Sequence, residues 1–287
     1  MPLELVRVTT GDGLRLDGSL RRSDAPADGG LVDAALLVHG TGSNFYGSTL
    51  MDAIESRLVG RGIAVLRINT RGHDGISTSA TMSGGVRQGA AYEVLSDCRH
   101  DLAAWIAFLI EQGFSRLLLA GHSLGALKAC YAMSEEPHDA VRAVAAVSPP
   151  WLSHARFLQS AKGAVFAETY ALAKTLVAAG RGEELMQIEF PLPYLVSARA
   201  YLDKYHRDET YNVLALLPRI RAPLLAVFGG QEIQQNVAFR ELPQAMEQLA
   251  AAQALPIEVG VIAGADHFYA SARDELAARI DRWLRKQ

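Results

Sequence analysis

A serine lies at the centre of a short glycine-containing motif that is suited to nucleophilic catalysis. Residues 121–125 read Gly-His-Ser-Leu-Gly, between the apolar run 117–120 and the helix-forming sequence 126–133. A strand, a sharp turn and a helix in this order lift a serine hydroxyl above the edge of a sheet, at a helix N-terminus. The two glycines flank the turn because side chains there would collide with the strand and the helix. The alternative is a chance match, which would usually lack these flanking elements, so we expect Ser123 to be a nucleophile.

A serine nucleophile needs a base within hydrogen-bond reach. His267 lies between the expected strand 257–262 and the expected final helix 271–285, and it is the only one of the eight histidines so placed. In a sheet that carries a nucleophilic serine, such a base is expected in the loop after the last strand. We therefore interpret His267 as the base, the alternative being an ordinary histidine in a surface loop.

A carboxylate should orient the imidazole, and it is expected after the strand 224–228. Glu232 lies there, and no aspartate occurs between Asp208 and Asp266. Glutamate can hold the imidazole tautomer, although its extra methylene requires a different backbone position. Glu232 is our candidate, its alternative being an exposed loop acid, and Asp266 is the second choice because it adjoins the histidine.

Two backbone N–H groups should bind the oxyanion that develops during acyl transfer. One belongs to the residue after the nucleophile, Leu124, and the other to the loop after the strand 34–38, where we nominate Thr41. A dinucleotide-binding fingerprint is the alternative for this glycine-containing loop, but Phe45 occupies the third glycine position. The sequence holds no phosphate-binding loop and no metal-ligand spacing, so we expect neither a cofactor nor a metal.

Short apolar runs alternate with helical patterns through most of the chain. An expected hairpin (3–9 and 14–20) is followed by buried strands at 34–38, 63–68, 116–120 and 140–147, and later at 224–228 and 257–262. Repeated strand–helix units predict an α/β fold, with a mostly parallel eight-stranded sheet covered by helices on both faces. A long polar loop is expected at 75–89.

The alternation stops between residues 151 and 217, where only helical patterns occur, at about 154–180, 183–188 and 194–206. This block is too long for a loop. We therefore predict an α/β core formed by residues 1–150 and 218–287 and an inserted helical cap formed by residues 151–217.

Composition excludes several classes of function. The 287 residues are 49% apolar and 21% charged, with a net charge of −3 and no basic run, which argues against nucleic-acid binding. No stretch has the pattern of a signal peptide or the length of a membrane span, so a cytoplasmic protein without membrane partners is expected. Cys98 and Cys130 fall in helical patterns and are interpreted as buried reduced thiols. The oligomeric state is not readable from the sequence.

The order of serine, glutamate and histidine, together with the His39-Gly40 loop, resembles the α/β-hydrolase fold family over nearly the whole chain. The resemblance implies a Ser123–His267–acid triad, an oxyanion hole at Thr41 and Leu124, and a helical cap. Residues 69–74 are similar to the Arg-Gly-His-Gly run of many members. Residues 41–45 and 205–212 look somewhat like a subgroup of uncharacterised hydrolases that includes fungal siderophore esterases.

These residues predict a serine hydrolase that cleaves a small-molecule carboxylic ester through an acyl-enzyme. The same machinery could catalyse acyl transfer, or cleave a small amide or peptide. A non-catalytic binding protein on this scaffold is the alternative from another class, since a fold alone does not establish activity. A missing triad member would have favoured that alternative, and none is missing.

Overall fold

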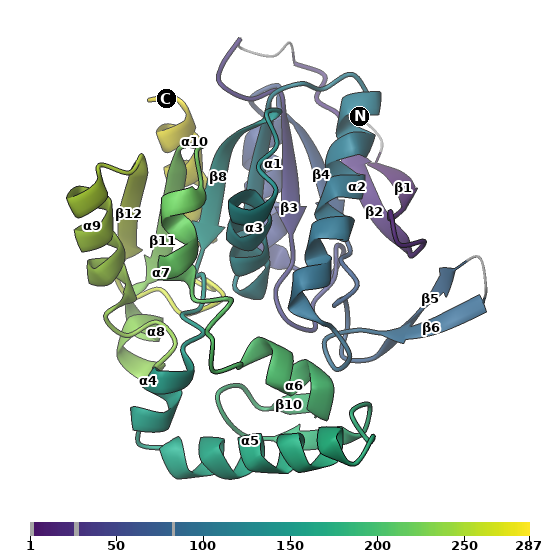
Figure 1. Cartoon of the computed structure of the whole chain (residues 1–287). Helices are drawn as coiled ribbons and strands as arrows, with labels where there is room; N and C mark the ends of the chain where they lie inside the picture. Colours follow the sequence, from purple (N-terminus) through teal and green to yellow (C-terminus); the bar gives the residue numbers. More distant parts are fainter. Residues whose placement is uncertain (1–2, 26–28, 82–83) are drawn as a thin grey trace.

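Eight strands form one twisted, mostly parallel sheet in the computed structural model, which describes residues 3–25, 29–81 and 84–287. Their order across the sheet is β1-β2-β4-β3-β7-β8-β11-β12 (Figure 1). The strands are β1 (Leu3–Thr9), β2 (Arg15–Arg21), β3 (Ala34–Val38), β4 (Ala64–Ile68), β7 (Leu117–His122), β8 (Val141–Val147), β11 (Leu224–Gly229) and β12 (Ile257–Ile262). The pairs β1–β2 and β2–β4 are antiparallel, and all other neighbours are parallel. The predicted fold class is confirmed.

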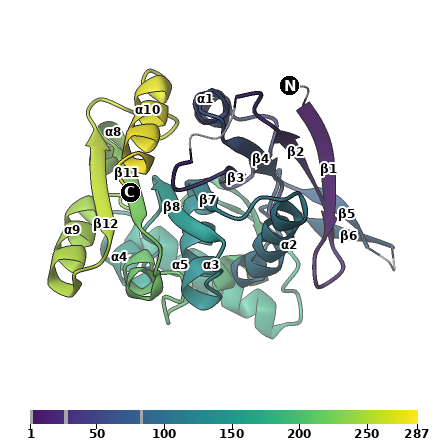
Figure 2. The same cartoon turned by 90° about the horizontal axis from the view of Figure 1, so that it is seen from above.

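Helices cover both faces of the sheet, and the central strands are therefore buried on both sides. Figure 2 shows α1 (Thr49–Val59) and α10 (Arg273–Leu284) on one face, and α2 (Cys98–Glu111), α3 (Leu124–Glu135) and α9 (Leu242–Gln253) on the other. Alternate residues of β3 enter two different cores: Leu36 packs with the α2–α3 side and Leu37 with the α1–α10 side. This explains the continuous apolar runs of these strands.

The inserted segment (residues 151–217) lies between β8 and β11 in the chain and beyond the carboxyl ends of the central strands (Figure 1). Its elements are α4 (His154–Gln159), α5 (Gly163–Ala178), β9 (Leu185–Ile188), β10 (Tyr194–Ser197), α6 (Ala198–Lys204), α7 (Val213–Leu216) and the 3₁₀ turn η2 (Leu217–Arg219). Aromatic rings from α4, α5 and α6 pack together at its centre, among them Phe157, Phe166 and Tyr201.

The expectation of helices alone in this segment is wrong in two places. The helix expected at 154–180 is divided because the chain is extended at Ser160. The patterns at 183–188 and at the start of 194–206 are the antiparallel strands β9 and β10. Met186 and Ile188 are buried while the residue between them is exposed, which is the period of a strand, and Pro191 and Pro193 in the connection cannot continue a helix.

The polar stretch expected as a loop at 75–89 contains a second hairpin, β5 (Ser77–Thr81) and β6 (Gly84–Gln88). It projects from the body of the protein (Figure 1), and only Ser79 of these two strands is buried. A hairpin exposed on both faces has no apolar alternation, and this explains why the sequence pattern did not indicate strands.

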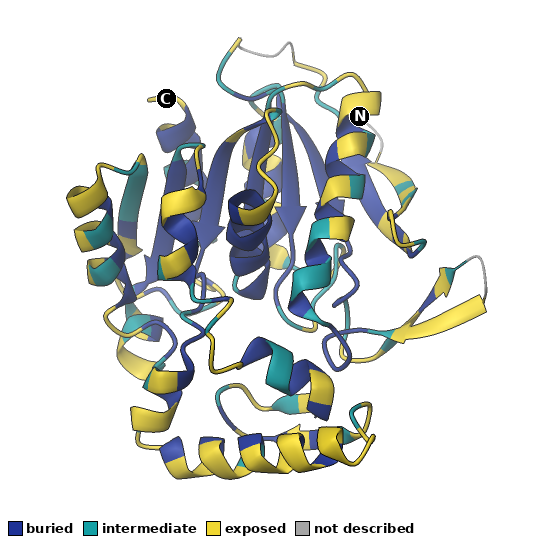
Figure 3. Ribbon diagram, viewed as in Figure 1, coloured by how far each residue is buried: buried dark blue, intermediate teal, exposed yellow. Residues whose placement is uncertain are grey.

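Burial is concentrated in the sheet, whereas the outward face of α5 is exposed (Figure 3). The remaining elements are short: the 3₁₀ turn η1 (Leu95–Asp97) precedes α2, and α8 (Gly230–Gln235) follows β11. Among the described residues, none of the helices combines the length and apolar character that crossing a membrane requires.

Candidate active site

Ser123 occupies a strained turn between β7 and α3. β7 ends at His122 and α3 begins at Leu124, and Ser123 between them has φ 56° and ψ −124°. Positive φ is uncommon for a residue with a side chain and marks a conformation that the surroundings must enforce. A Cβ at Gly121 would overlap the backbone of Gly125, and one at Gly125 would overlap the backbone at the end of β3. The glycines therefore allow the close approach that the turn requires.

The hydroxyl of Ser123 lies within hydrogen-bond distance of His267, which in turn contacts Glu232. Oγ of Ser123 is 3.1 Å from Nε2 of His267, and Nδ1 of His267 is 2.6 Å from Oε2 of Glu232. The three side chains follow β7, β12 and β11, so all three come from the carboxyl edge of the sheet. Because a carboxylate accepts at Nδ1, that nitrogen carries the hydrogen, and Nε2 is left as an acceptor that faces Ser123.

The carboxylate of Glu232 is buried, with 4% of the residue exposed, and it accepts three hydrogen bonds. Oε1 accepts from the N–H of Gly229 at 2.7 Å and from the hydroxyl of Ser148 at 2.6 Å, while Oε2 accepts from His267. Glu232 is the third residue of α8, and its side chain reaches back to the residue that precedes the helix. This is how the longer side chain of a glutamate is accommodated here.

Asp266, the second choice for the acid, has a different partner. Its Oδ1 accepts a hydrogen bond from the backbone N–H of Ala270 at 2.8 Å, in the loop that follows β12. The structure therefore brings Glu232, and not Asp266, to Nδ1 of His267.

Sequence reasoning missed two side chains that hold the acid. Ser148, with φ 50°, directly follows β8, and its Oγ is 2.9 Å from the hydroxyl of Tyr269. Tyr269 also donates to the carbonyl of Val227 at 3.1 Å. The position of Ser148 at the end of a strand beside β11 was a usable signal, whereas nothing in the sequence connects Tyr269 with it.

The loop after β3 touches the nucleophile. A Cβ at Gly40 would lie 3.1 Å from Cβ and 3.6 Å from Oγ of Ser123, so the backbone of this loop packs directly against the serine. Thr41 follows at once, and Leu124 is the first residue of α3. Within the described ranges, the structure gives neither of these two backbone N–H groups a hydrogen-bond partner.

A second histidine, His122, supports the loop that carries His267. Its Nε2 is 2.8 Å from the carbonyl oxygen of His267, and the two rings are 4.8 Å apart. Burial, and next the neighbouring imidazole, lower the pKa of His122 to about 3. The ring is therefore neutral, and its Nε2–H donates to that carbonyl. Phe239 also lies near His267, with ring centroids 5.2 Å apart.

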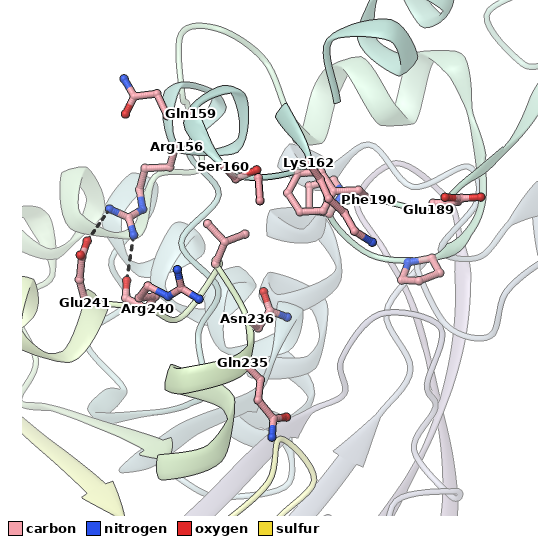
Figure 4. A pocket seen from close by; sticks show the side chains of 14 residues that line it. Arg156, Gln159, Ser160, Lys162, Glu189, Phe190, Gln235, Asn236, Arg240 and Glu241 are labelled. Atoms are coloured by element: carbon pink, nitrogen blue, oxygen red, sulfur yellow. Dashed lines mark hydrogen bonds and ion pairs between the residues drawn. The ribbon is translucent and has the colours of Figure 1, made fainter. Parts of the chain in front are cut away.

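A groove of about 530 Å³ lies between the inserted segment and the stretch 235–241, which begins at the last residue of α8 (Figure 4). Charged and polar side chains line much of it, and Phe190 contributes an apolar part. Arg156 is held in place by Glu241 at 3.0 Å and by the carbonyl of Arg240 at 3.0 Å (Figure 4). The side chains of Ser123, His267 and Glu232 do not line this groove.

Both cysteines are buried and unbridged. Burial raises the pKa of the Cys130 thiol to about 12, and it raises the pKa of Cys98 well above its usual range. A thiol in such surroundings is a poor nucleophile because it is rarely ionised.

Comparison with known proteins identifies the family to which this chain belongs. The model of a family described as "Alpha/beta hydrolase family" matches residues 35–279, and the chain belongs to that family. Sequence comparison with curated proteins finds no match.

Solved structures of low sequence identity share the fold. The esterase Pf2001 of Pyrococcus furiosus aligns with a TM-score of 0.62 and 18% identity, over 99% of this chain and 91% of that one. Est1E of Butyrivibrio proteoclasticus, solved with ferulic acid bound, gives 0.65 and 17%, over 98% of each chain. The alpha/beta hydrolase GrgF of a Penicillium species gives 0.65 and 16%, over 100% of this chain and 99% of that one.

Proposed function

We propose that this protein is a serine hydrolase that cleaves a carboxylic ester of a small molecule through an acyl-enzyme intermediate. The observation that carries the proposal is the unbroken chain of hydrogen-bond contacts from Ser123 through His267 to Glu232, at a strained turn on the carboxyl edge of the sheet. In it, Ser123 is the nucleophile, His267 is the general base and Glu232 is the orienting acid.

The hydrogens are arranged for proton transfer in the required direction. Nδ1–H of His267 donates to Glu232, so that Nε2 can take the proton of Ser123 while Oγ attacks the ester carbonyl carbon. The tetrahedral intermediate collapses, the C–O bond to the alcohol breaks, and the alcohol leaves with the proton from Nε2. Water then attacks the acyl-enzyme with His267 as base, the acid is released, and Ser123 regains its proton.

The oxyanion of each tetrahedral intermediate needs hydrogen-bond donors that are fixed before the reaction. The backbone N–H groups of Thr41 and Leu124 are our candidates. Their lack of a partner within the described part of the chain, and the contact of Gly40 with Ser123, support this assignment. We name residues 39–44 the oxyanion loop.

The inserted segment is proposed to be a cap that limits which esters reach Ser123. Support comes from its location beyond the carboxyl ends of the central strands, where active sites of open α/β sheets lie (Figure 1). Esterases occur among the structural neighbours, and this supports the proposal that the substrate is an ester and not another acyl compound.

Hydrolysis of p-nitrophenyl esters of increasing acyl length tests the proposal. We expect turnover by the wild type, with an optimum length that reflects the space under the cap, and its collapse in Ser123→Ala and His267→Ala. Wild-type protein that is inert toward these esters and is not labelled by a fluorophosphonate would contradict the proposed function.

A further inference from the structure

A cluster of buried charged side chains lies beside the oxyanion loop and has no part in the mechanism above. Glu93 and Lys128 are 0% exposed and Lys204 is 4% exposed. Glu93 precedes η1, Lys128 is on α3 and Lys204 is on α6 of the inserted segment. Glu93 forms an ion pair with Lys128, and its Oε2 is 3.8 Å from Nζ of Lys204. A well-packed apolar cluster would usually be at least as stable, so stability alone does not account for these buried charges.

The ammonium of Lys128 fixes the direction of a threonine hydroxyl. Nζ of Lys128 donates to Oγ1 of Thr70 at 2.9 Å, and an ammonium group has no lone pair to accept in return. The hydrogen of the Thr70 hydroxyl therefore points elsewhere, and Nε2 of His39 is 3.2 Å away. The backbone N–H of Thr70 also donates to this Nε2, at 3.1 Å.

Two donors at Nε2 determine the tautomer of His39. Nε2 carries no hydrogen, so the hydrogen of the neutral ring lies on Nδ1, which is 2.8 Å from the carbonyl oxygen of Gly40. Burial, and next the charge of Lys128, lower the pKa of His39 to about 3, so the ring stays neutral at ordinary pH. The same carbonyl accepts from the N–H of Ser43 at 3.2 Å, which closes the turn.

The carbonyl of Gly40 belongs to the same peptide unit as the N–H of Thr41. In a trans peptide these two groups point to opposite sides, so a hydrogen bond that holds the carbonyl also sets the direction of the N–H. We propose that Lys128 and Thr70 are positioning residues that, through the tautomer of His39, hold the Gly40–Thr41 peptide in the orientation that binds the oxyanion. This inference rests on the proposed esterase function.

The same cluster joins the oxyanion loop to the inserted segment. Lys204 donates to the carbonyl of Ala90 at 3.0 Å and shares Glu93 with Lys128. Ala90 also lies close to the oxyanion loop, because a Cβ added at Gly42 would be 3.9 Å from the Cβ of Ala90. The carboxylate of Glu93 therefore contacts both Lys204 of α6 and Lys128, which donates to Thr70.

Substitution of Thr70 tests the positioning role, with p-nitrophenyl acetate as substrate. Thr70→Val keeps the shape but removes the hydroxyl. We expect kcat to fall about tenfold, which is less than the ~100–1,000-fold known for loss of an oxyanion donor, because the backbone N–H of residue 70 still donates to Nε2 of His39. KM should change less than twofold, because the orientation matters in the transition state and not in substrate binding. Thr70→Ser restores the hydroxyl and should recover most of kcat.

Thr10→Val is the matched control, since Thr10 is also buried and, among the described residues, its hydroxyl contacts Asp12 and Leu14 of the β1–β2 turn and not His39. It should lower the Tm without lowering kcat. A merely structural role for Thr70 would give the same pattern as Thr10, and so would overturn the proposal.

A double-mutant cycle tests the connection to the cap. Lys204→Met removes one of the two ammonium groups that pair with Glu93 in the described part of the chain. Lys128 still pairs with Glu93, while its hydrogen bond to Thr70 should weaken. We expect its effect on kcat to be non-additive with that of Thr70→Val and additive with that of Thr10→Val. Additivity in both combinations would refute the link.

Fluorophosphonate labelling of Ser123 separates this inference from the proposed function. If the wild type is labelled and Thr70→Val is labelled at the wild-type rate, the positioning role is wrong while the esterase proposal stands. A wild type that neither hydrolyses the ester nor is labelled would contradict the proposed function, and the positioning role with it.

Discussion

Replacement of Glu232 by glutamine tests how the hydrogens of the proposed triad are arranged. The backbone N–H of Gly229 is a fixed donor 2.7 Å from Oε1 of Glu232, so the amide oxygen of a glutamine has to face it. The amide NH₂ then faces Nδ1 of His267. Nδ1 must become an acceptor, the ring hydrogen moves to Nε2, and Nε2 can no longer accept the proton of Ser123.

The size of the effect follows from the contacts. Reversal of the amide would set its NH₂ against the N–H of Gly229 and leave a buried donor unsatisfied, which costs about 1–3 kcal/mol. Since about 1.4 kcal/mol corresponds to a factor of ten, this cost would leave between about a sixth and about a hundredth of the molecules in the competent tautomer. The lost charge also removes stabilisation of the imidazolium, and the corresponding carboxylate-to-amide change in a serine protease lowers kcat by about 10⁴. We expect kcat to fall by about 10³–10⁴ with little change in KM.

Steady-state hydrolysis of p-nitrophenyl acetate measures this effect, and Glu232→Ala is the informative comparison. Alanine supplies no donor to Nδ1, so the imidazole is free to take either tautomer, and we expect the alanine variant to be more active than the glutamine variant. A glutamine variant that keeps more than about a tenth of wild-type kcat, or that exceeds the alanine variant, would refute the reasoning.

Three further substitutions follow from the same contacts. Ser148→Ala removes a donor to the carboxylate of Glu232, so urea denaturation should show an unfolding free energy lower by about 1.5–3 kcal/mol, and steady-state kinetics should show a lower kcat. Ser134→Ala also removes a buried hydroxyl but should leave kcat unchanged. The pKa of His122, about 3 in the folded protein, lies below the value of about 6.5 expected in the unfolded chain, so the unfolded state binds more protons between these values and stability is lost as the pH falls through that window. His122→Gln, which can keep the N–H donor, should reduce the acid dependence by up to about 1.4 kcal/mol per pH unit, and equal slopes for both proteins would contradict this. Gly40→Ala sets a methyl group 3.1 Å from Cβ of Ser123, so kcat should fall while the Tm changes little, and an unchanged kcat would show that the contact is unimportant.

Much of the site could be predicted because a parallel sheet gathers the ends of its strands at one edge. The buried strands are continuous apolar runs, and the residues that follow them are therefore known once the strands are known. Ser123, Glu232 and His267 each follow such a strand, and the structure brings the three together. Glu232 contacts the histidine, whereas Asp266 does not. This difference depends on the backbone path of the segments after β11 and β12, which no sequence pattern determines.

Contacts between distant polar side chains could not be predicted. Lys128 lies on a helix whose other buried residues are mostly apolar, and a lysine there is ordinarily expected in solvent. Its burial depends on Glu93 and Thr70, which come from other parts of the chain. The strands β9 and β10 could not be predicted for a different reason. Strands of four residues are too short for their periodicity to be distinguished from that of a helix.

Trapping of the acyl-enzyme tests the central claim most directly. Wild-type protein mixed with p-nitrophenyl acetate, quenched in acid within the first turnovers and digested for mass spectrometry, should carry an acetyl group on Ser123, and His267→Ala should carry far less at the same time. Release of nitrophenol without an acylated Ser123, or acylation of another residue at the rate of turnover, would contradict a mechanism in which Ser123 is the nucleophile.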